Sequence, residues 1–185
     1  MANILRENCA DLVAHNGMAA GGVDAIHVAW QCLDGDLLSL RFVVTGAGNQ
    51  LALPPLSTVP QRRDGLWQAS CFEMFAATDA GYAEYNFSPS GDWAAYHFTG
   101  YRRGMALLNV PAPHIRLARS DHGLTLEVTL SLPPKLAQDA RVGFSAIIAD
   151  TAGNKAYWAL RHPPGVPDFH HDDCFAARLG APQRP

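Results

Sequence analysis

The chain has 185 residues, of which 48% are hydrophobic and 17% charged, and its net charge is −3. That length is typical of one domain, which can bury a core large enough to need no metal or disulfide. The small negative charge, with no block rich in Lys and Arg, argues against nucleic-acid binding and gives no support for an anionic membrane as partner.

The four cysteines, Cys9, Cys32, Cys71 and Cys174, include no CxxC pair. Their spacing gives no zinc-ligand pattern, and free cysteines of this kind are usually reduced and buried. The N-terminus holds no apolar run long enough for a signal peptide, and no stretch approaches the roughly 20 apolar residues of a membrane span. We therefore expect a cytoplasmic protein with no bound metal.

The first expected element is a short helix over Asn8–Ala14, within an N-terminal segment of residues 1–24. After it, the dominant signal is the alternation of apolar and polar residues that is typical of strands. Short turns rich in Gly, Asp, Asn and Pro separate these runs, as at Asp34-Gly35 and Ser88–Asp92. The strands indicated in this way are residues 26–33, 36–45, 66–75, 82–87, 93–98, 114–119, 124–132, 142–150 and 156–162.

About nine or ten short strands at this spacing predict an all-β fold, an antiparallel sandwich or barrel. We expect one domain over residues 25–180, followed by a frayed tail of residues 181–185. The longest irregular segment is Pro163–Asp173, and a loop of that length inside a compact domain is often functional.

The run Leu66–Arg102 is the most informative part of the chain, because it gathers Trp, Tyr and Phe around a single acid in an apolar strand pattern. That acid is Glu73, and an uncompensated buried carboxylate is very costly. Glu73 must therefore be paired, hydrogen-bonded or turned toward a wet cleft. Aromatic side chains around one carboxylate favour a binding surface over a reaction centre.

Two motifs in this run carry a family resemblance. Trp67, Glu73 and Phe75 form a W-x5-E-x-F pattern, and a Tyr/Phe-rich strand ends in the Ser-Pro-Ser-Gly turn 88–91. Together with the segments 157–165 and 167–171, they resemble the DOMON-like proteins of bacteria and, beyond these, the family 9 carbohydrate-binding modules. The resemblance implies an immunoglobulin-like antiparallel β-sandwich that binds a small ligand, most often a carbohydrate, and is not an enzyme.

The resemblance implies that Trp67 and Glu73 contribute to sugar binding. Rings stack on the C–H faces of sugars, and carboxylates accept hydrogen bonds from their hydroxyls. We add Asn86, which can both donate and accept, and Arg102. The alternative is that Trp67 packs at the rim of the core and that Glu73 pairs with an arginine.

A second aromatic platform is expected from Tyr157-Trp158. Alternation places these two side chains on opposite faces, so only one can contact the ligand, and we name Trp158 as the candidate. Glu84 is interpreted as part of the polar face of its strand.

The His-rich segment supplies the last candidates, His162, Asp168 and His170. They either border the ligand or hold the Pro-rich loop across one end of the sandwich by hydrogen bonds to the backbone. A metal site is not expected, because His170 and His171 would point to opposite faces of a strand.

Two other functions stay open. Some DOMON domains hold b-type haem between Met and His, for which Met74, Met105, His97, His162 and His170 are available. A hydrolase acting on a sugar would need paired carboxylates, which the spacing allows but does not require. Exposed strand edges also allow a homodimer.

Overall fold

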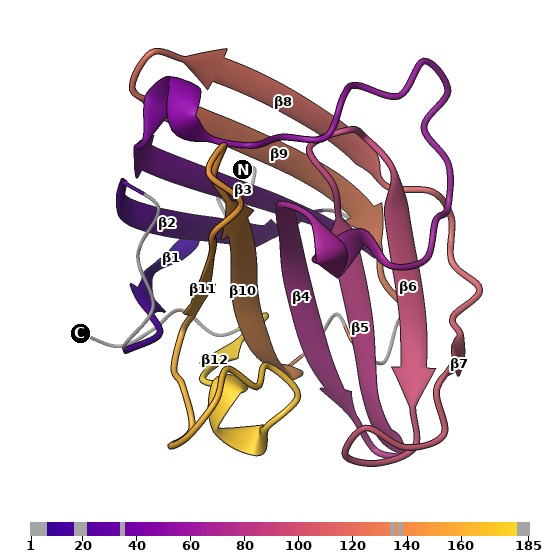
Figure 1. Ribbon diagram of the computed structural model, residues 1–185. Helices are drawn as coiled ribbons and strands as arrows, with labels where there is room; N and C mark the ends of the chain where they lie inside the picture. The colour runs from indigo at the N-terminus through magenta and orange to yellow at the C-terminus, as the bar shows by residue number, and fades with distance from the viewer. Residues whose placement is uncertain (1–6, 17–21, 34–35, 134–135, 137–138, 181–185) are drawn as a thin grey trace.

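The computed structural model describes residues 7–16, 22–33, 36–133, 136 and 139–180. The expected turn at Asp34-Gly35 and the expected tail 181–185 lie outside the described residues. The described chain is almost entirely antiparallel β-structure, which confirms the predicted fold class (Figure 1). Its helical structure is limited to the 3-10 segments η1 (Gly48–Gln50), η2 (Leu66–Gln68) and η3 (Asp172–Cys174). Within this part of the chain, no helix is long and apolar enough to cross a membrane.

Twelve strands form two sheets that are joined by the first strand. The first sheet has the order β1-β2-β3-β9-β8 and the second the order β7-β6-β5-β4-β10-β11, with β12 beside β10. The bounds are β1 Asn8–Ala14, β2 Val23–Cys32, β3 Leu37–Gly46, β4 Cys71–Thr78, β5 Gly81–Phe87, β6 Trp93–Phe98, β7 Ala106–Leu107, β8 His114–Ser120, β9 Gly123–Ser131, β10 Arg141–Ala149, β11 Lys155–Ala159 and β12 Ala177–Arg178. Strand β1 pairs with β2 through most of its length and with β11 through its last two residues.

The segment Asn8–Ala14, for which the sequence indicates a helix, is strand β1. Leu12 is buried between the sheets, whereas its neighbours Asp11 and Val13 are exposed, so the segment does alternate. Its inward positions include only one large apolar side chain, which makes that alternation hard to detect. The sheet therefore starts ahead of residue 25, where we expected the domain to begin.

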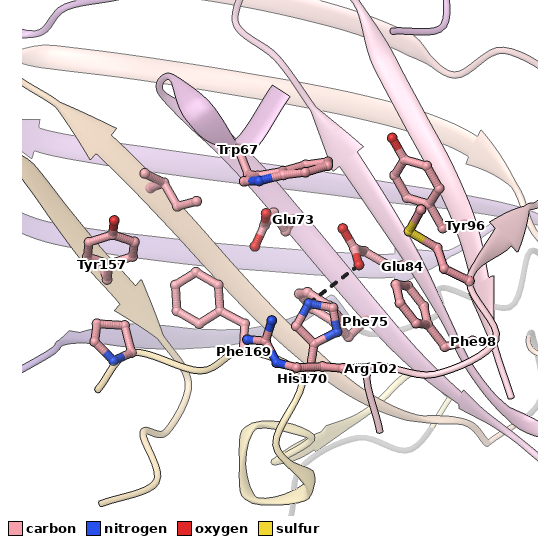
Figure 2. A pocket seen from close by; sticks show the side chains of 13 residues that line it. Trp67, Glu73, Phe75, Glu84, Tyr96, Phe98, Arg102, Tyr157, Phe169 and His170 are labelled. Carbon is pink, nitrogen blue, oxygen red and sulfur yellow. Dashed lines mark ion pairs between the residues drawn. The ribbon is translucent and has the colours of Figure 1, made fainter. Parts of the chain in front are cut away.

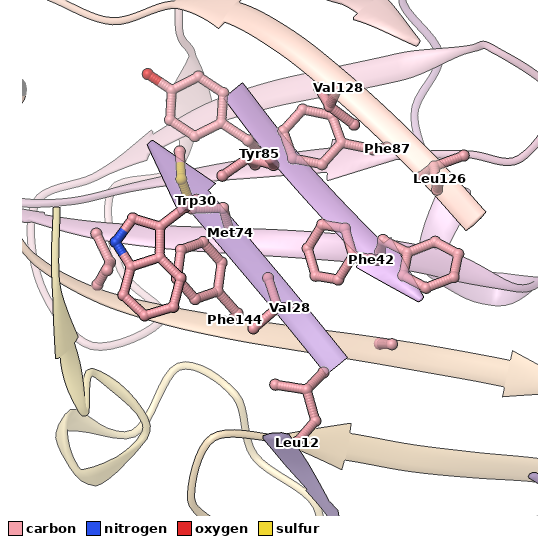
Figure 3. Close-up of a cluster of buried hydrophobic side chains, with 14 of the residues drawn as sticks. Leu12, Val28, Trp30, Phe42, Met74, Tyr85, Phe87, Leu126, Val128 and Phe144 are labelled. Carbon is pink, nitrogen blue, oxygen red and sulfur yellow. The ribbon is translucent and has the colours of Figure 1, made fainter. Parts of the chain in front are cut away.

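The core lies between the two sheets, where aromatic rings from both of them meet (Figure 3). The ring of Trp30 lies 4.9 Å from that of Phe144, and the ring of Phe42 lies 5.1 Å from that of Phe72. Each of these side chains is almost fully buried. This packing fixes which face of β4, β5 and β10 points inward, and the alternation of strand side chains then fixes what their outer faces present.

The outer face of the second sheet carries its own layer of aromatic and acidic residues. Phe75, Tyr82, Tyr96 and Phe98 form part of a second buried cluster there, together with Phe169. Phe169 comes from the long segment that follows β11, which runs back over this sheet. The face is therefore covered rather than open to solvent, and the cover leaves a cavity.

Candidate functional site

A cavity of about 370 Å³ lies on the outer face of the second sheet, lined by side chains from its strands and from neighbouring loops (Figure 2). Strands β4, β5, β6, β10 and β11 supply its floor, and segments around η2, residue 102 and residue 168 supply its walls. This volume falls in the range of pockets for small ligands, roughly 300–1,000 Å³. The lining residues are Trp67, Glu73, Phe75, Glu84, Tyr96, Phe98, Arg102, Met105, Ile147, Tyr157, Pro167, Phe169 and His170.

Trp67 forms the aromatic edge of the cavity. It lies in η2, where the chain makes a 3-10 turn instead of the straight strand that we expected from Leu66 onward. Its side chain stays 39% exposed, and its ring meets that of Tyr96 edge-on at 6.3 Å. Figure 2 shows the indole lying above the Glu73 carboxyl group. A large ring that is open on one side offers a stacking surface to a ligand.

Glu73 is a buried acid on the cavity floor. It is 3% exposed and accepts one hydrogen bond, from the Ser145 hydroxyl to Oε2 at 2.9 Å. Burial, reinforced by the negative charge of Glu84, raises the pKa of Glu73 to about 8, against the effect of the Ser145 hydrogen bond. No Arg, Lys or His among the described residues forms an ion pair with Glu73.

Glu84 is the second acid of the floor, and it is better satisfied. Its Oε1 accepts a hydrogen bond from Asn86 Nδ2 at 2.7 Å, and its Oε2 lies 3.8 Å from Nε2 of His170. Burial raises the pKa of Glu84, while the Asn86 hydrogen bond and the charge of Arg102 oppose that rise. Asn86 does not line the cavity; it holds the Glu84 carboxyl in place.

His170 is a neutral side chain in this wall. The Tyr82 hydroxyl lies 2.7 Å from Nδ1 of His170 and also accepts a hydrogen bond from the backbone N–H of Arg102. When the hydroxyl donates its proton to Nδ1, the proton of the neutral ring is on Nε2, the nitrogen nearer to Glu84. Burial, assisted by the charge of Arg102, lowers the pKa of His170 to about 4.

An ion pair between Arg102 and Asp168 holds the loop that carries His170 in place. Asp168 accepts hydrogen bonds from Arg102, from the Tyr101 hydroxyl and from the backbone N–H of His170. Burial opposes ionisation of Asp168, but the hydrogen bonds from Tyr101 and Arg102 outweigh it and lower the pKa. Arg102 has a φ of 52°, an uncommon conformation for a residue other than glycine.

The cavity brings together four of the residues named from the sequence, Trp67, Glu73, Arg102 and His170. Asn86 and Asp168 lie behind this lining and hold Glu84 and Arg102 respectively.

Trp158 and His162 lie elsewhere. Trp158 points inward and belongs to the core cluster, so its neighbour Tyr157 takes the cavity position that we assigned to Trp158. The alternation of β11 requires this exchange. His162 contacts the backbone oxygen of Val13 through Nε2 at 2.8 Å, and its ring meets that of His15 edge-on. Its contacts fit the loop-holding alternative.

Sequence reasoning missed Glu84 and Phe169 as cavity residues, and of Tyr157 and Trp158 it named the one that the cavity does not use. For Glu84 a signal existed, because it shares a strand face with Asn86 and pairs in register close to Glu73. Phe169 carried no such signal, since only the path of the loop after β11 brings it over the sheet.

The fold places the candidate haem ligands in different parts of the molecule. Met105 and His170 line the cavity, whereas Met74 points into the core between the sheets. Within the described residues, no group of three or more His, Cys, Asp or Glu side chains gathers as a metal site.

No protein-family model and no curated protein matches the chain. Among solved structures, it is similar to a carbohydrate-binding module of family 9 from Caldicellulosiruptor kristjanssonii, in complex with cellotriose, with 11% identity and a TM-score of 0.49. That match covers 87% of this chain and 75% of the other. A glucose complex of a family 9 module from the same organism gives 12% identity and a TM-score of 0.44, over 76% and 69% of the two chains.

Proposed function

We propose that the cavity binds a small carbohydrate and that the protein is a binding domain without catalytic activity. The observation that carries this proposal is the open face of Trp67 above the buried carboxyl of Glu73, inside a cavity of about 370 Å³. A sugar presents C–H faces that stack on an indole and hydroxyls that bond to a carboxyl group. Tyr157, from the floor strand β11, and Phe169 add further ring surface to the cavity.

A second candidate is hydrolysis of a glycosidic bond, because Glu73 and Glu84 share one cavity. Glycosidases need one protonated and one ionised carboxyl group, so their two environments push the pKa values apart. The charge of Glu84 helps to raise the pKa of Glu73, so the pair can supply one ionised and one protonated group. Incubation with aryl glycosides tests this candidate, and the binding proposal expects no release of aglycone above the rate of a Glu73→Gln variant.

Tryptophan fluorescence tests the binding proposal. Monosaccharides and disaccharides added to the protein should change its emission in a saturable way, because Trp67 is partly exposed at the cavity. The change should disappear in Trp67→Phe, and calorimetry should show weaker binding by Trp67→Ala.

The matched control for these variants is Leu56→Ala, which removes an exposed apolar side chain outside the cavity. It should bind as the wild type does. Absence of a saturable signal, and of heat, with every sugar in the panel would contradict the proposal.

A further inference from the structure

The lining of the cavity has more acidic side chains than basic ones. It includes two acids, Glu73 and Glu84, and one arginine, Arg102. Arg102 already forms an ion pair outside the cavity lining, since its Nη2 lies 2.7 Å from Oδ1 of Asp168. Its side chain is half exposed. His170 adds no charge at neutral pH, since its pKa is about 4. Two buried acids therefore face one cavity, and Glu73 has no cationic partner among the described residues.

Glu73 is the less satisfied of these two acids. Glu84 accepts a hydrogen bond from the Asn86 amide, and the nearby charge of Arg102 stabilises its ionised form. Glu73 has only the neutral Ser145 hydroxyl, which bonds to Oε2, and no described residue donates to Oε1. A buried carboxylate that lacks a cationic partner is costly, whereas a paired one can be stable. The position next to Glu73 that a cation would fill is the cavity itself.

The walls suit a cation as well. Trp67, Phe75 and Tyr157 line the same space as Glu73. The faces of aromatic rings carry negative partial charge and attract ammonium groups, most strongly where water is excluded. A ring-walled cavity with a free carboxyl oxygen is chemically complementary to an organic amine.

We infer that the ligand carries a protonated amine which pairs with Glu73. This inference rests on the proposed function, and it narrows the ligand class from carbohydrates in general to amino sugars. The amine forms a charge-assisted hydrogen bond to Oε1, while the C–H faces of the sugar ring stack on Trp67. The hydroxyls remain available to Glu84 and Arg102.

The protonation of Glu73 is compatible with this pairing. With a pKa of about 8, Glu73 is mostly neutral in the empty cavity at pH 7. Ionising it to meet a cation at that pH reduces affinity by about tenfold. A charge-assisted hydrogen bond in a buried site outweighs a cost of that size.

Calorimetry with matched sugars at pH 7 tests the inference. Glucose, glucosamine and N-acetylglucosamine differ at one position, which carries a hydroxyl, an amine or a neutral amide, and the galactose series repeats the comparison. After the cost of ionising Glu73, the amine of each series should bind several-fold to about tenfold more tightly than its two neutral counterparts. In Glu73→Gln this preference should vanish, so that the three sugars of each series bind with about equal affinity.

Glu127→Gln is the control, because it makes the same substitution on the exposed face of β9 in the other sheet. It should keep the preference for the amine, and thermal unfolding checks that both variants fold. Equal binding of the amine and the neutral sugars by the wild type would overturn the inference and leave the proposed function standing. A preference that persists in Glu73→Gln would overturn it too. If no sugar of either series binds, the proposed function fails and the inference fails with it.

Discussion

Arg102 and Asp168 join two separate loops beside the cavity, with Nη2 of the arginine 2.7 Å from Oδ1 of the aspartate. Arg102 follows strand β6, and Asp168 belongs to the long segment after β11. Because Asp168 also accepts a hydrogen bond from the backbone N–H of His170, the pair fixes the position of His170 at the cavity. One ion pair therefore couples two walls of the cavity.

Asp168→Asn should weaken both the fold and ligand binding. Arg102 is half exposed, but Asp168 is only 14% exposed and accepts three hydrogen bonds, so the substitution should lower the free energy of unfolding by about 1–2 kcal/mol. The loosened walls should lower affinity by about threefold to tenfold, measured by calorimetry. Asp172→Asn, which breaks an exposed pair with Arg141, is the control and should leave affinity unchanged. Unaltered binding by Asp168→Asn would show that the pair does not shape the cavity.

Tyr157 and Trp158 should respond in opposite ways to truncation. Trp158→Ala leaves a hole in the core and should cost about 3–5 kcal/mol of stability in urea unfolding. Tyr157→Ala removes a ring from the cavity wall, so it should cost far less stability but lower affinity about fivefold or more. If the stability losses were reversed, the assignment of the two faces of β11 would be wrong.

These two residues show where sequence reasoning reached its limit. The alternation of apolar residues located most strands closely, as for Tyr82–Phe87 and Trp93–Phe98, because one-sided burial leaves a period of two. Strand β11 is covered on both faces, so Tyr157 and Trp158 are both suitable neighbours for a core. Nothing in the sequence then indicates which of them faces the cavity.

The site was predictable only where its residues are close in the sequence. Trp67 and Glu73 are close in the chain, and their proximity in space needs only one short turn. The contacts of Glu84 with His170, and the cover provided by Phe169, depend on how the loop after β11 crosses the sheet. Such long-range placement follows from the packing of the whole fold and has no local sequence signal.

Stability should fall as the pH rises from 6.5 to 8, because of Glu73. Its pKa is raised from 4.5 to about 8 on folding, so the folded state holds the proton more tightly, and that stabilisation is lost as the pH rises through this range. His170, with its pKa lowered from 6.5 to about 4, contributes with the opposite sign, mainly below about pH 7.

Urea unfolding at pH 6.5, 7.2 and 8.0 measures this dependence, which for one group cannot exceed about 1.4 kcal/mol per pH unit. Glu73→Gln should flatten the slope, because it removes the group whose pKa lies in this range. Glu127→Gln should keep the wild-type slope. If Glu73→Gln had the same slope as the wild type, the titration of Glu73 could not be the cause of the pH dependence.

Two tyrosines of strand β5 offer a matched pair of hydroxyl deletions. The Tyr82 hydroxyl bonds to His170 and to the backbone of Arg102, whereas the buried Tyr85 hydroxyl has no partner among the described residues. Tyr82→Phe should lower the free energy of unfolding by about 1–3 kcal/mol, since it leaves both partners unsatisfied. Tyr85→Phe should be neutral or stabilising. Equal losses in thermal or urea unfolding would contradict this reading of the cavity wall.

The most direct test of the central claim is an NMR titration that follows the indole N–H signals of the four tryptophans. Trp30, Trp93 and Trp158 are buried in the core, and only Trp67 faces the cavity. On addition of glucosamine or glucose, the Trp67 signal, assigned by its absence in Trp67→Phe, should shift progressively to saturation while the other three stay almost fixed. A Trp67 signal that does not move with either sugar would contradict the claim that this cavity is a carbohydrate-binding site.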